Sequence, residues 1–181
     1  MTDAFPTLLP LLAAQGVTPR KGLGQHYLSD PAILQGIVDA AALPAGAVVI
    51  EVGPGPGTLT AALAAVAGRL IAVELDAYLA ELLAELYRPY AHVHIVAGDA
   101  LAKPPAALLA ETAGADGGAA PYFLVANLPY YITSPLLRHY LEADPPPQRA
   151  VVTIQRDVAR RILAAPPQMS LLALAVQVYA Q

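Results

Sequence analysis

Five short apolar runs alternate along the chain with longer segments in which leucine and alanine recur at helical spacing. The runs cover residues 47–52, 70–75, 92–99, 122–127 and 150–155. Runs of this length, bounded by turn residues, are typical of strands that are buried on both faces. Strands separated by helices pair in parallel, because each returning helix covers a face of the sheet. The alternation therefore predicts an α/β fold, with a mostly parallel sheet and helices on both faces.

The high apolar content does not indicate a membrane protein. Hydrophobic residues make up 56% of the 181 residues, but much of this share is alanine. A spanning helix needs about 18 or more apolar residues in a row, and the longest candidate is broken by Pro44, Gly46 and Glu51. The N-terminus lacks a basic region, so we expect no secretory signal, no membrane partner and a cytoplasmic location. The absence of cysteine excludes disulfides and thiolate metal sites.

A chain of this length suits one structural domain. The first 45 residues carry two helical patterns joined by a glycine-containing loop. The second pattern starts with Ser29 or Asp30 as N-cap and Pro31 in the first turn. We therefore divide the chain into N-terminal helices with their loop, residues 1–45, and an α/β unit, residues 46–181.

Three glycines separate the first strand from the helix that follows it. Gly53, Gly55 and Gly57 stand in G-x-G-x-G spacing, just after Glu51. Glycines let the backbone approach a ligand closely, and the start of a helix offers free N–H groups. The dinucleotide fingerprint is G-x-G-x-x-G, so this spacing disfavours a dehydrogenase. Taken alone, the motif is also consistent with a simple tight turn.

Polar residues stand at the ends of the next three runs. Glu74 lies close to the spacing from the glycines at which a carboxylate reaches ribose hydroxyls. Asp99 can accept from an adenine amino group, and Asn127 ends the fourth run. Each alone could be a helix N-cap. Because parallel strands bring their carboxyl ends to one edge, together they predict a nucleoside-cofactor pocket.

Six segments carry a resemblance to a known family. The chain resembles the ribosomal RNA adenine N6,N6-dimethyltransferases, which use S-adenosylmethionine to modify small-subunit 16S RNA. The segments are KGLGQHYLSD (21–30), EVGPGPGTLT (51–60), VELD (73–76), GDAL (98–101), NLPYYITSPLL (127–137) and QRDVARRI (155–162). The resemblance implies a Rossmann-like methyltransferase fold and small-subunit ribosomal RNA, or its precursor particle, as partner. It also implies a further sheet edge and a helical C-terminal domain, so we expect this chain to be the catalytic domain alone.

The resemblance also implies which residues hold the cofactor. Gly53 and its turn would bind the methionine part, Glu74 the ribose and Asp99 the adenine. Residues 1–45 would provide N-terminal helices and a lid loop, and residues 46–181 would form the S-adenosylmethionine-binding methyltransferase domain. The full set of implied cofactor-binding residues is Gln25, His26, Leu28, Glu51, Gly53, Gly55, Glu74, Leu75, Asp99, Ala100 and Asn127.

The implied catalytic stretch is Asn127, Leu128, Pro129 and Tyr130. An aromatic amine is a poor nucleophile, because its lone pair is delocalised into the ring. The Asn127 side-chain oxygen and the Leu128 carbonyl can each accept one N–H of the amine, which leaves the lone pair facing the methyl group. Pro129 holds that carbonyl in place, and Tyr130 can stack on the base.

The basic residues are few but clustered. The formal net charge of −4 gives little general attraction to phosphate. Arg156, Arg160 and Arg161 fall on one predicted helix, which is either a solvated face or an RNA-backbone contact. We predict that they bind RNA and that the protein is a monomer. His92 and His94 alternate within the third run and so share a face, but no further ligand completes a metal site, and we expect no metal.

Two other functions fit the same motifs. A large-subunit ribosomal RNA adenine methyltransferase of the antibiotic-resistance type would share the fold, although the NLPY stretch and the arginine-rich helix disfavour it. A non-catalytic RNA-binding or assembly factor could also reuse the fold, but the complete stretch 127–130 favours chemistry. The segment AAPPQMSLLALAVQ is shorter than its counterpart in the family, which leaves RNA positioning there open.

Overall fold

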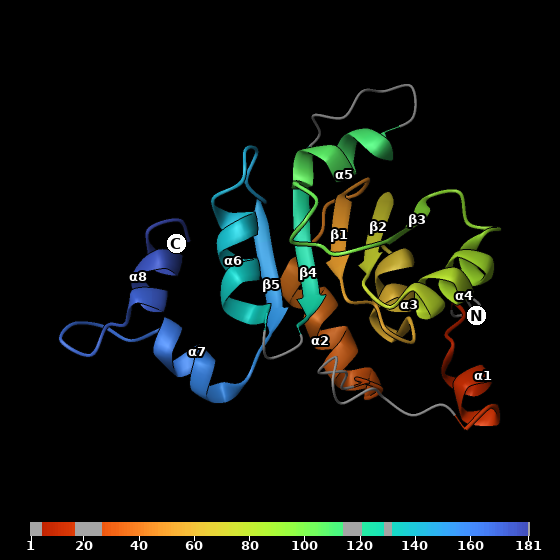
Figure 1. Cartoon of the computed structure of the whole chain (residues 1–181), viewed down its shortest axis with the longest axis horizontal. Helices are drawn as coiled ribbons and strands as arrows, with labels where there is room; N and C mark the ends of the chain where they lie inside the picture. Colours follow the sequence, from red (N-terminus) through yellow and green to blue (C-terminus); the bar gives the residue numbers. More distant parts are fainter. Residues whose placement is uncertain (1–4, 17–26, 114–120, 129–131, 181) are drawn as a thin grey trace.

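The centre of the fold is one parallel sheet. The computed structural model describes residues 5–16, 27–113, 121–128 and 132–180. The strands are β1 (Val48–Val52), β2 (Arg69–Glu74), β3 (Val93–Ala97), β4 (Tyr122–Asn127) and β5 (Arg149–Thr153). They lie in the order β3-β2-β1-β4-β5, and every neighbouring pair is parallel (Figure 1). The predicted strands and their parallel arrangement are confirmed, with strand ends that differ by one or two residues.

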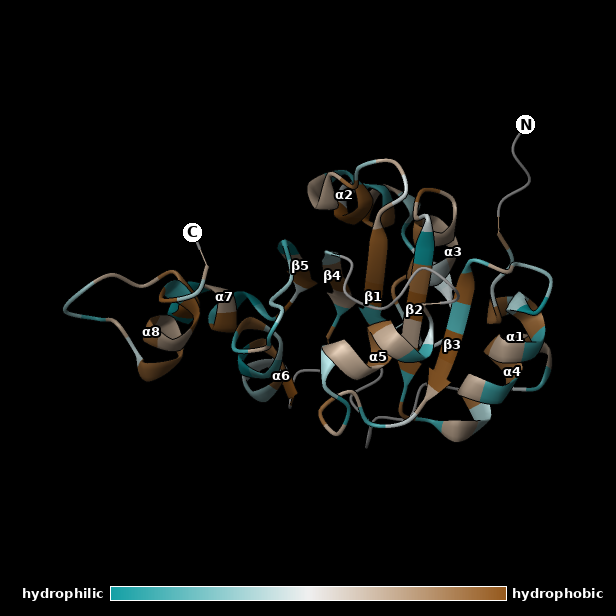
Figure 2. Ribbon diagram, turned by 90° about the horizontal axis from the view of Figure 1, so that it is seen from above, coloured by the Kyte–Doolittle hydropathy of each residue, from teal (hydrophilic) through white to brown (hydrophobic). Residues whose placement is uncertain are grey.

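Helices cover both faces of the sheet. They are α1 (Leu9–Ala14), α2 (Pro31–Ala41), α3 (Thr58–Ala64), α4 (Ala77–Tyr87), α5 (Pro105–Glu111), α6 (Thr133–Leu141), α7 (Arg156–Ile162) and α8 (Leu171–Gln177). One core cluster packs helices α1, α2, α3 and α4 against one face of the sheet. A second core cluster packs α5 and α6 against the other face (Figures 1 and 2). Beyond β5, α8 packs against α6 and α7. Within the described residues, no helix is long and apolar enough to cross a membrane.

The central strand β1 explains why the apolar runs are continuous. All five of its residues are buried. Val49 belongs to the cluster under α2, α3 and α4, whereas Val48, Ile50 and Val52 belong to the cluster under α5 and α6. A strand that is covered on both faces cannot alternate apolar with polar residues, because neither face meets water. The continuous apolar runs in the sequence therefore reflect strands that are buried on both faces of the sheet.

Short polar side chains cap three of the described helices: α2, α4 and α8, where the Ser170 hydroxyl accepts the N–H of Ala173 at 3.2 Å. The Asp30 carboxylate accepts the N–H of Ala32 at 2.9 Å, so Asp30 and not Ser29 is the N-cap of α2. Asp76 caps α4 in the same way, by accepting the N–H of Tyr78 at 3.1 Å. Each cap satisfies a backbone donor that has no partner inside its helix.

The N-terminal residues belong to the same core as the sheet. Leu8 and Leu12 are buried in the cluster beneath α2, α3 and α4. The Tyr87 hydroxyl also donates to the Pro6 carbonyl at 2.8 Å, which ties this segment to the end of α4. The division into residues 1–45 and 46–181 stays a prediction.

We expect Gly68→Ala to destabilise the fold. A Cβ at residue 68 would lie 2.5 Å from the Gly46 Cα, so the turns before β1 and β2 would have to separate. Overpacking of this kind costs about 1–3 kcal/mol, which equilibrium urea unfolding measures. Gly36→Ala in α2 is the control, because an added Cβ there meets nothing within 4 Å and should stabilise the helix by about 0.5–1 kcal/mol. Unchanged stability of Gly68→Ala would contradict the close approach.

Candidate functional site

The polar strand ends meet at the edge of the sheet where the strand order reverses. Along the chain, β2 and β3 follow on one side of β1, whereas β4 lies on its other side. Figure 1 shows the arrowheads of β4 and β5 at the same edge, from which the chain continues into α7. Open α/β sheets bind ligands at such a reversal, outside the carboxyl ends of the strands.

Glu74, the last residue of β2, is buried and held by two backbone donors. Its Oε2 accepts the N–H of Gly55 at 2.9 Å, and its Oε1 accepts the N–H of Asp76 at 2.9 Å. Burial raises the pKa of Glu74 and these hydrogen bonds oppose the rise, while the Asp76 carboxylate adds to it. The carboxylate is therefore fixed between the glycine turn and the start of α4.

The glycine turn lies against the N-terminal part of the chain. Gly53 donates to the Val73 carbonyl at 2.9 Å, which ties the turn to β2. Gly55 has a φ of +56°, and a Cβ there would stand 3.5 Å from the Tyr27 ring. The N–H of Leu8 donates to the Pro56 carbonyl at 2.7 Å. Two segments that precede β1 thus pack on the turn that follows it.

Glu51, in the central strand just before this turn, is a buried carboxyl group. Its side chain is 1% exposed. Among the described residues neither carboxyl oxygen has a partner, and neither does the Thr60 hydroxyl nearby. Burial raises the pKa of Glu51 to about 8, and the neighbouring Glu74 adds to the rise. Burial therefore favours the protonated, uncharged form of Glu51.

The turn after β3 places an exposed carboxylate, that of Asp99, near the end of β2. Asp99 lies two residues past the strand, and its exposed carboxylate accepts the N–H of Leu101 at 2.9 Å. The N–H of Gly98 donates to the Glu74 carbonyl at 2.8 Å, which brings this turn beside the end of β2. Ala100 is buried, whereas the Leu75 side chain is 51% exposed. Leu75 thus offers an apolar surface next to the Glu74 carboxylate.

The end of β4 is held by the neighbouring strand β5. Asn127 and Thr153 are register partners in the two strands. The Thr153 hydroxyl donates to Asn127 Oδ1 at 2.5 Å, and the Thr153 carbonyl accepts the N–H of Leu128 at 3.3 Å. No local sequence pattern marks Thr153, because the register of β4 against β5 depends on long-range pairing.

The predicted RNA-binding arginines lie on α7. Arg156, Arg160 and Arg161 are all exposed. Arg160 Nη1 lies 3.5 Å from Asp157 Oδ1 in an exposed ion pair, which contributes little to stability. The helix follows β5 directly, so it begins at the edge where Asn127 ends β4.

Some predicted site residues lie outside the described residues. Gln25, His26, Pro129 and Tyr130 are among these. Leu28 is described, and it packs against the same core cluster as Tyr27. The structure thus brings Glu51, Gly53, Gly55, Glu74, Leu75, Asp99, Ala100, Asn127 and Leu128 to one edge of the sheet, and their roles stay predictions.

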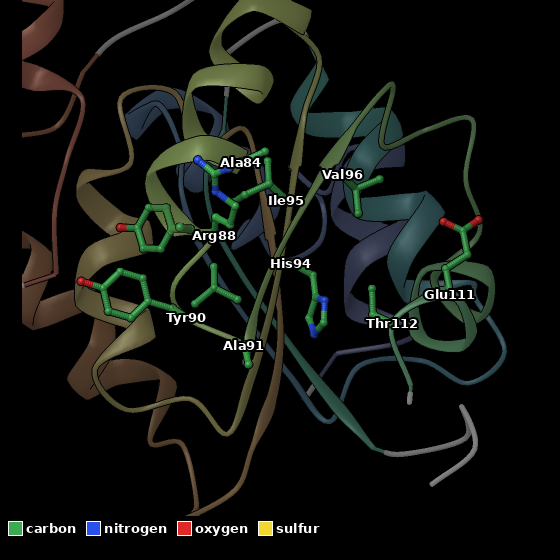
Figure 3. Close-up of a pocket in the computed structure, with 11 residues that line it drawn as sticks. Ala84, Arg88, Tyr90, Ala91, His94, Ile95, Val96, Glu111 and Thr112 are labelled. Carbon is green, nitrogen blue, oxygen red and sulfur yellow. The ribbon is translucent and has the colours of Figure 1, made fainter. Parts of the chain in front are cut away.

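A hollow along the free edge of β3 is separate from this site. Figure 3 shows Arg88, Tyr90, His94, Glu111 and Thr112 around it. Arg88, Glu111 and Thr112 lie at the ends of α4 and α5, whose C-termini point away from the carboxyl edge of the sheet. The hollow contains none of the predicted site residues.

The two histidines near β3 do not share a face, contrary to the prediction from alternation. His92 precedes the strand, and its Nε2 bonds the Ala64 carbonyl at 3.0 Å. His94 lines the hollow, and burial lowers its pKa, with Arg69 and His92 contributing. The strand alternation does not extend to His92, because β3 begins one residue later. Within the described part of the chain, no three histidine or acidic side chains could hold one metal ion.

Comparison with known proteins agrees with the fold. A dimethyladenosine transferase from Plasmodium falciparum superposes with a TM-score of 0.68 at 28% identity, over 84% of this chain and 52% of that chain. The 23S rRNA methyltransferase ErmE superposes with a TM-score of 0.63 at 30% identity, over 75% and 50% of the two chains. The fold is therefore the Rossmann-like methyltransferase fold, as predicted.

The sequence matches define the family. The model of the ribosomal RNA adenine dimethylase family matches residues 16–181. The ribosomal RNA small subunit methyltransferase A of Dehalococcoides mccartyi (strain ATCC BAA-2266) is 46% identical over 160 residues, which are 88% of this chain and 53% of that protein. The chain belongs to the ribosomal RNA adenine dimethylase family. It spans about half the length of the curated relatives that it matches.

We expect Glu51→Gln to change how stability depends on pH. The folded chain keeps the Glu51 proton up to a pKa of about 8, whereas the unfolded chain releases it near 4.5. Between these values the folded state binds more protons, so the free energy of unfolding falls as pH rises, by up to about 1.4 kcal/mol per pH unit. A glutamine side chain does not ionise, so the free energy of unfolding of the variant does not fall with pH for this reason.

Thermal unfolding at pH 5 and pH 8 measures the effect. The melting temperature of Glu51→Gln minus that of the wild type should increase between the two pH values. Glu81→Gln, at an exposed position on α4, is the matched control and should show no such increase. A Glu51→Gln difference that is the same at both pH values would show that Glu51 is already ionised in the folded chain.

Proposed function

We propose that the chain transfers methyl groups from S-adenosylmethionine to the N6 amine of adenines in small-subunit ribosomal RNA, as a cytoplasmic enzyme of ribosome assembly. The observation that carries the proposal is that the buried Glu74 carboxylate and the Asn127–Leu128 pair lie at the same edge of the sheet, at the ends of β2 and β4. Family membership supports ribosomal RNA adenine as substrate. The match to a small-subunit methyltransferase supports the choice of RNA.

The residues at this edge fit S-adenosylmethionine. Each Glu74 oxygen accepts one backbone N–H and has a further lone pair for a ribose hydroxyl. Leu75 offers an exposed apolar surface to the adenine, and Asp99 an exposed acceptor. Glu51 is a buried carboxyl without a partner among the described residues, which suits the ammonium group of the methionine part. When bound, the cofactor supplies a methyl group on a positively charged sulfur.

The remaining cofactor contacts are proposed from position. Gly53 and Gly55 in the turn would lie along the methionine part, and Ala100 would support Asp99. Gln25, His26 and Leu28 would come from the N-terminal lid. The packing of Tyr27 against Gly55 supports that assignment, because it places the residues just before α2 on the glycine turn. On this basis we propose residues 1–45 as N-terminal helices with a lid loop and residues 46–181 as the cofactor-binding domain.

At the end of β4 the chain would orient the adenine amine. The Asn127 side-chain oxygen and the Leu128 carbonyl would each accept one of its N–H groups, which turns the nitrogen lone pair toward the reacting carbon. Pro129 would restrict the backbone there, and Tyr130 would stack on the base. The methylated amine is acidic enough to lose its proton to water, so positioning and electrostatics supply most of the catalysis.

RNA would approach along α7. Its exposed Arg156, Arg160 and Arg161 follow β5 at the catalytic edge, which suits contacts to the phosphates on either side of the target base. Three such contacts give weak and salt-dependent binding. Further basic surface would therefore have to come from outside these residues. We propose that the protein works as a monomer.

We expect Glu74→Ala to weaken cofactor binding by about 1–3 kcal/mol, because charge-assisted hydrogen bonds to the ribose are lost. Calorimetric titration with S-adenosylhomocysteine measures the effect, and thermal unfolding shows whether the variant is folded at that temperature. Glu81→Ala on α4 is the control and should bind like the wild type. Binding of NAD but not of S-adenosylhomocysteine by the wild-type chain would contradict the cofactor assignment.

We expect Asn127→Ala to abolish methyl transfer while cofactor affinity stays within a few fold. Loss of one group that positions the reacting amine lowers the rate by about 100-fold or more. The assay uses labelled S-adenosylmethionine with unmethylated small-subunit precursor particles, followed by mapping of the modified base. Gln35→Ala, an exposed amide on α2, is the control.

Three outcomes would change the assignment. Equal losses of cofactor binding and rate in Asn127→Ala would show that Asn127 serves mainly the cofactor. Methylation of large-subunit RNA alone would favour the activity of the 23S rRNA methyltransferase ErmE, to which the chain is 30% identical. Cofactor binding without transfer to either RNA would indicate a binding or assembly factor.

A further inference from the structure

We propose that Thr153 is a positioning residue that sets both acceptor groups at the end of β4. The inference rests on the proposed function, in which the Asn127 side chain and the Leu128 carbonyl receive the target amine. None of the predicted sites includes Thr153, which ends β5. Its position relative to β4 is what brings it into the site.

Thr153 holds the two acceptor residues through two different groups. Asn127 and Thr153 are register partners, so their side chains stand next to each other on the same face of the sheet. The Thr153 hydroxyl donates to Asn127 Oδ1 at 2.5 Å. The Thr153 carbonyl accepts the N–H of Leu128 at 3.3 Å, and the Leu128 side chain is 3% exposed. One residue of β5 therefore fixes a side chain and a stretch of backbone at once.

The hydroxyl bond determines the direction in which Asn127 accepts. The terminal torsion of an asparagine side chain has a broad energy minimum, so packing alone orients the amide poorly. An amide oxygen has two lone pairs in its plane. When Thr153 occupies one, the direction of the second is set relative to β5. A misplacement of about 1 Å at a reacting centre costs as much as about 100-fold in rate, so this orientation matters for transfer.

Two variants separate the hydroxyl from the shape of the side chain. Thr153→Val keeps the β-branched form that suits a strand, and it keeps the backbone bond to Leu128, but it removes the donor. Thr153→Ser keeps the donor and loses only a methyl group. The matched control is Thr112→Val in the turn after α5, where the hydroxyl donates to the Leu108 carbonyl at 2.9 Å, away from the catalytic edge.

The kinetic arm measures single-turnover methyl transfer and cofactor affinity. We expect Thr153→Val to lower the transfer rate by about 10-fold to 100-fold, with the dissociation constant for S-adenosylhomocysteine unchanged within about twofold. Thr153→Ser should recover most of the rate, and Thr112→Val should match the wild type. A wild-type rate in Thr153→Val, or a serine variant as slow as the valine variant, would overturn the inference.

The spectroscopic arm uses the fact that Asn127 is the only asparagine among the 181 residues. A chain labelled with ¹⁵N-asparagine gives one side-chain amide pair in a ¹⁵N–¹H spectrum. This pair should shift in Thr153→Val, return toward its wild-type position in Thr153→Ser and stay in place in Thr112→Val. An unmoved pair in Thr153→Val would overturn the inference.

The two arms also separate this inference from the proposed function. If the wild-type chain transfers no methyl group to adenine in any RNA, the proposed function fails. The amide signal of Asn127 then still decides whether Thr153 orients that side chain, because the signal needs no turnover.

Discussion

One carboxylate, that of Glu74, joins the segments from which the ligand-binding edge is built. It accepts backbone N–H groups from the glycine turn after β1 and from the start of α4. The backbone carbonyl of the same residue receives the N–H of Gly98, in the turn after β3. A buried charge is tolerated only where it is hydrogen-bonded, and here the bonds come from segments that must meet for the site to exist. The hydrogen bonds that satisfy this buried carboxyl group are therefore the same ones that hold the segments of the site together.

The two acidic residues under the glycine turn differ because their partners differ. Glu74 has two backbone donors, which oppose the effect of burial on its pKa. Glu51 has no hydrogen-bond partner among the described residues, so burial and the neighbouring Glu74 raise its pKa to about 8. Because Glu51 and Glu74 interact electrostatically, a proton kept on one of them avoids two like charges buried near each other. The uncharged member is then the one that can ionise when a cation comes near.

The sequence predicts the strands well and the cross-strand contacts poorly. The run over residues 122–127 matches β4, because burial on both faces leaves a continuous apolar signal. Asn127 at its end could be assigned from position and from resemblance. Thr153 could not, since its role depends on the register of two strands whose residues pair through the fold and not through local pattern. The same limit explains His92, because the alternating pattern does not show that β3 begins one residue after it.

The order of the strands also bears on how the chain folds as it is synthesised. Val48 of the central strand pairs with Arg69 on one side and with Tyr122 on the other. Until β4 leaves the ribosome, one edge of β1 has no permanent partner, although its residues are almost entirely apolar. Long-range parallel pairing is slow, and exposed strand edges attract other chains. A nascent chain of this fold is therefore most open to misassociation with other chains while residues 53–121 are already made and β4 is not.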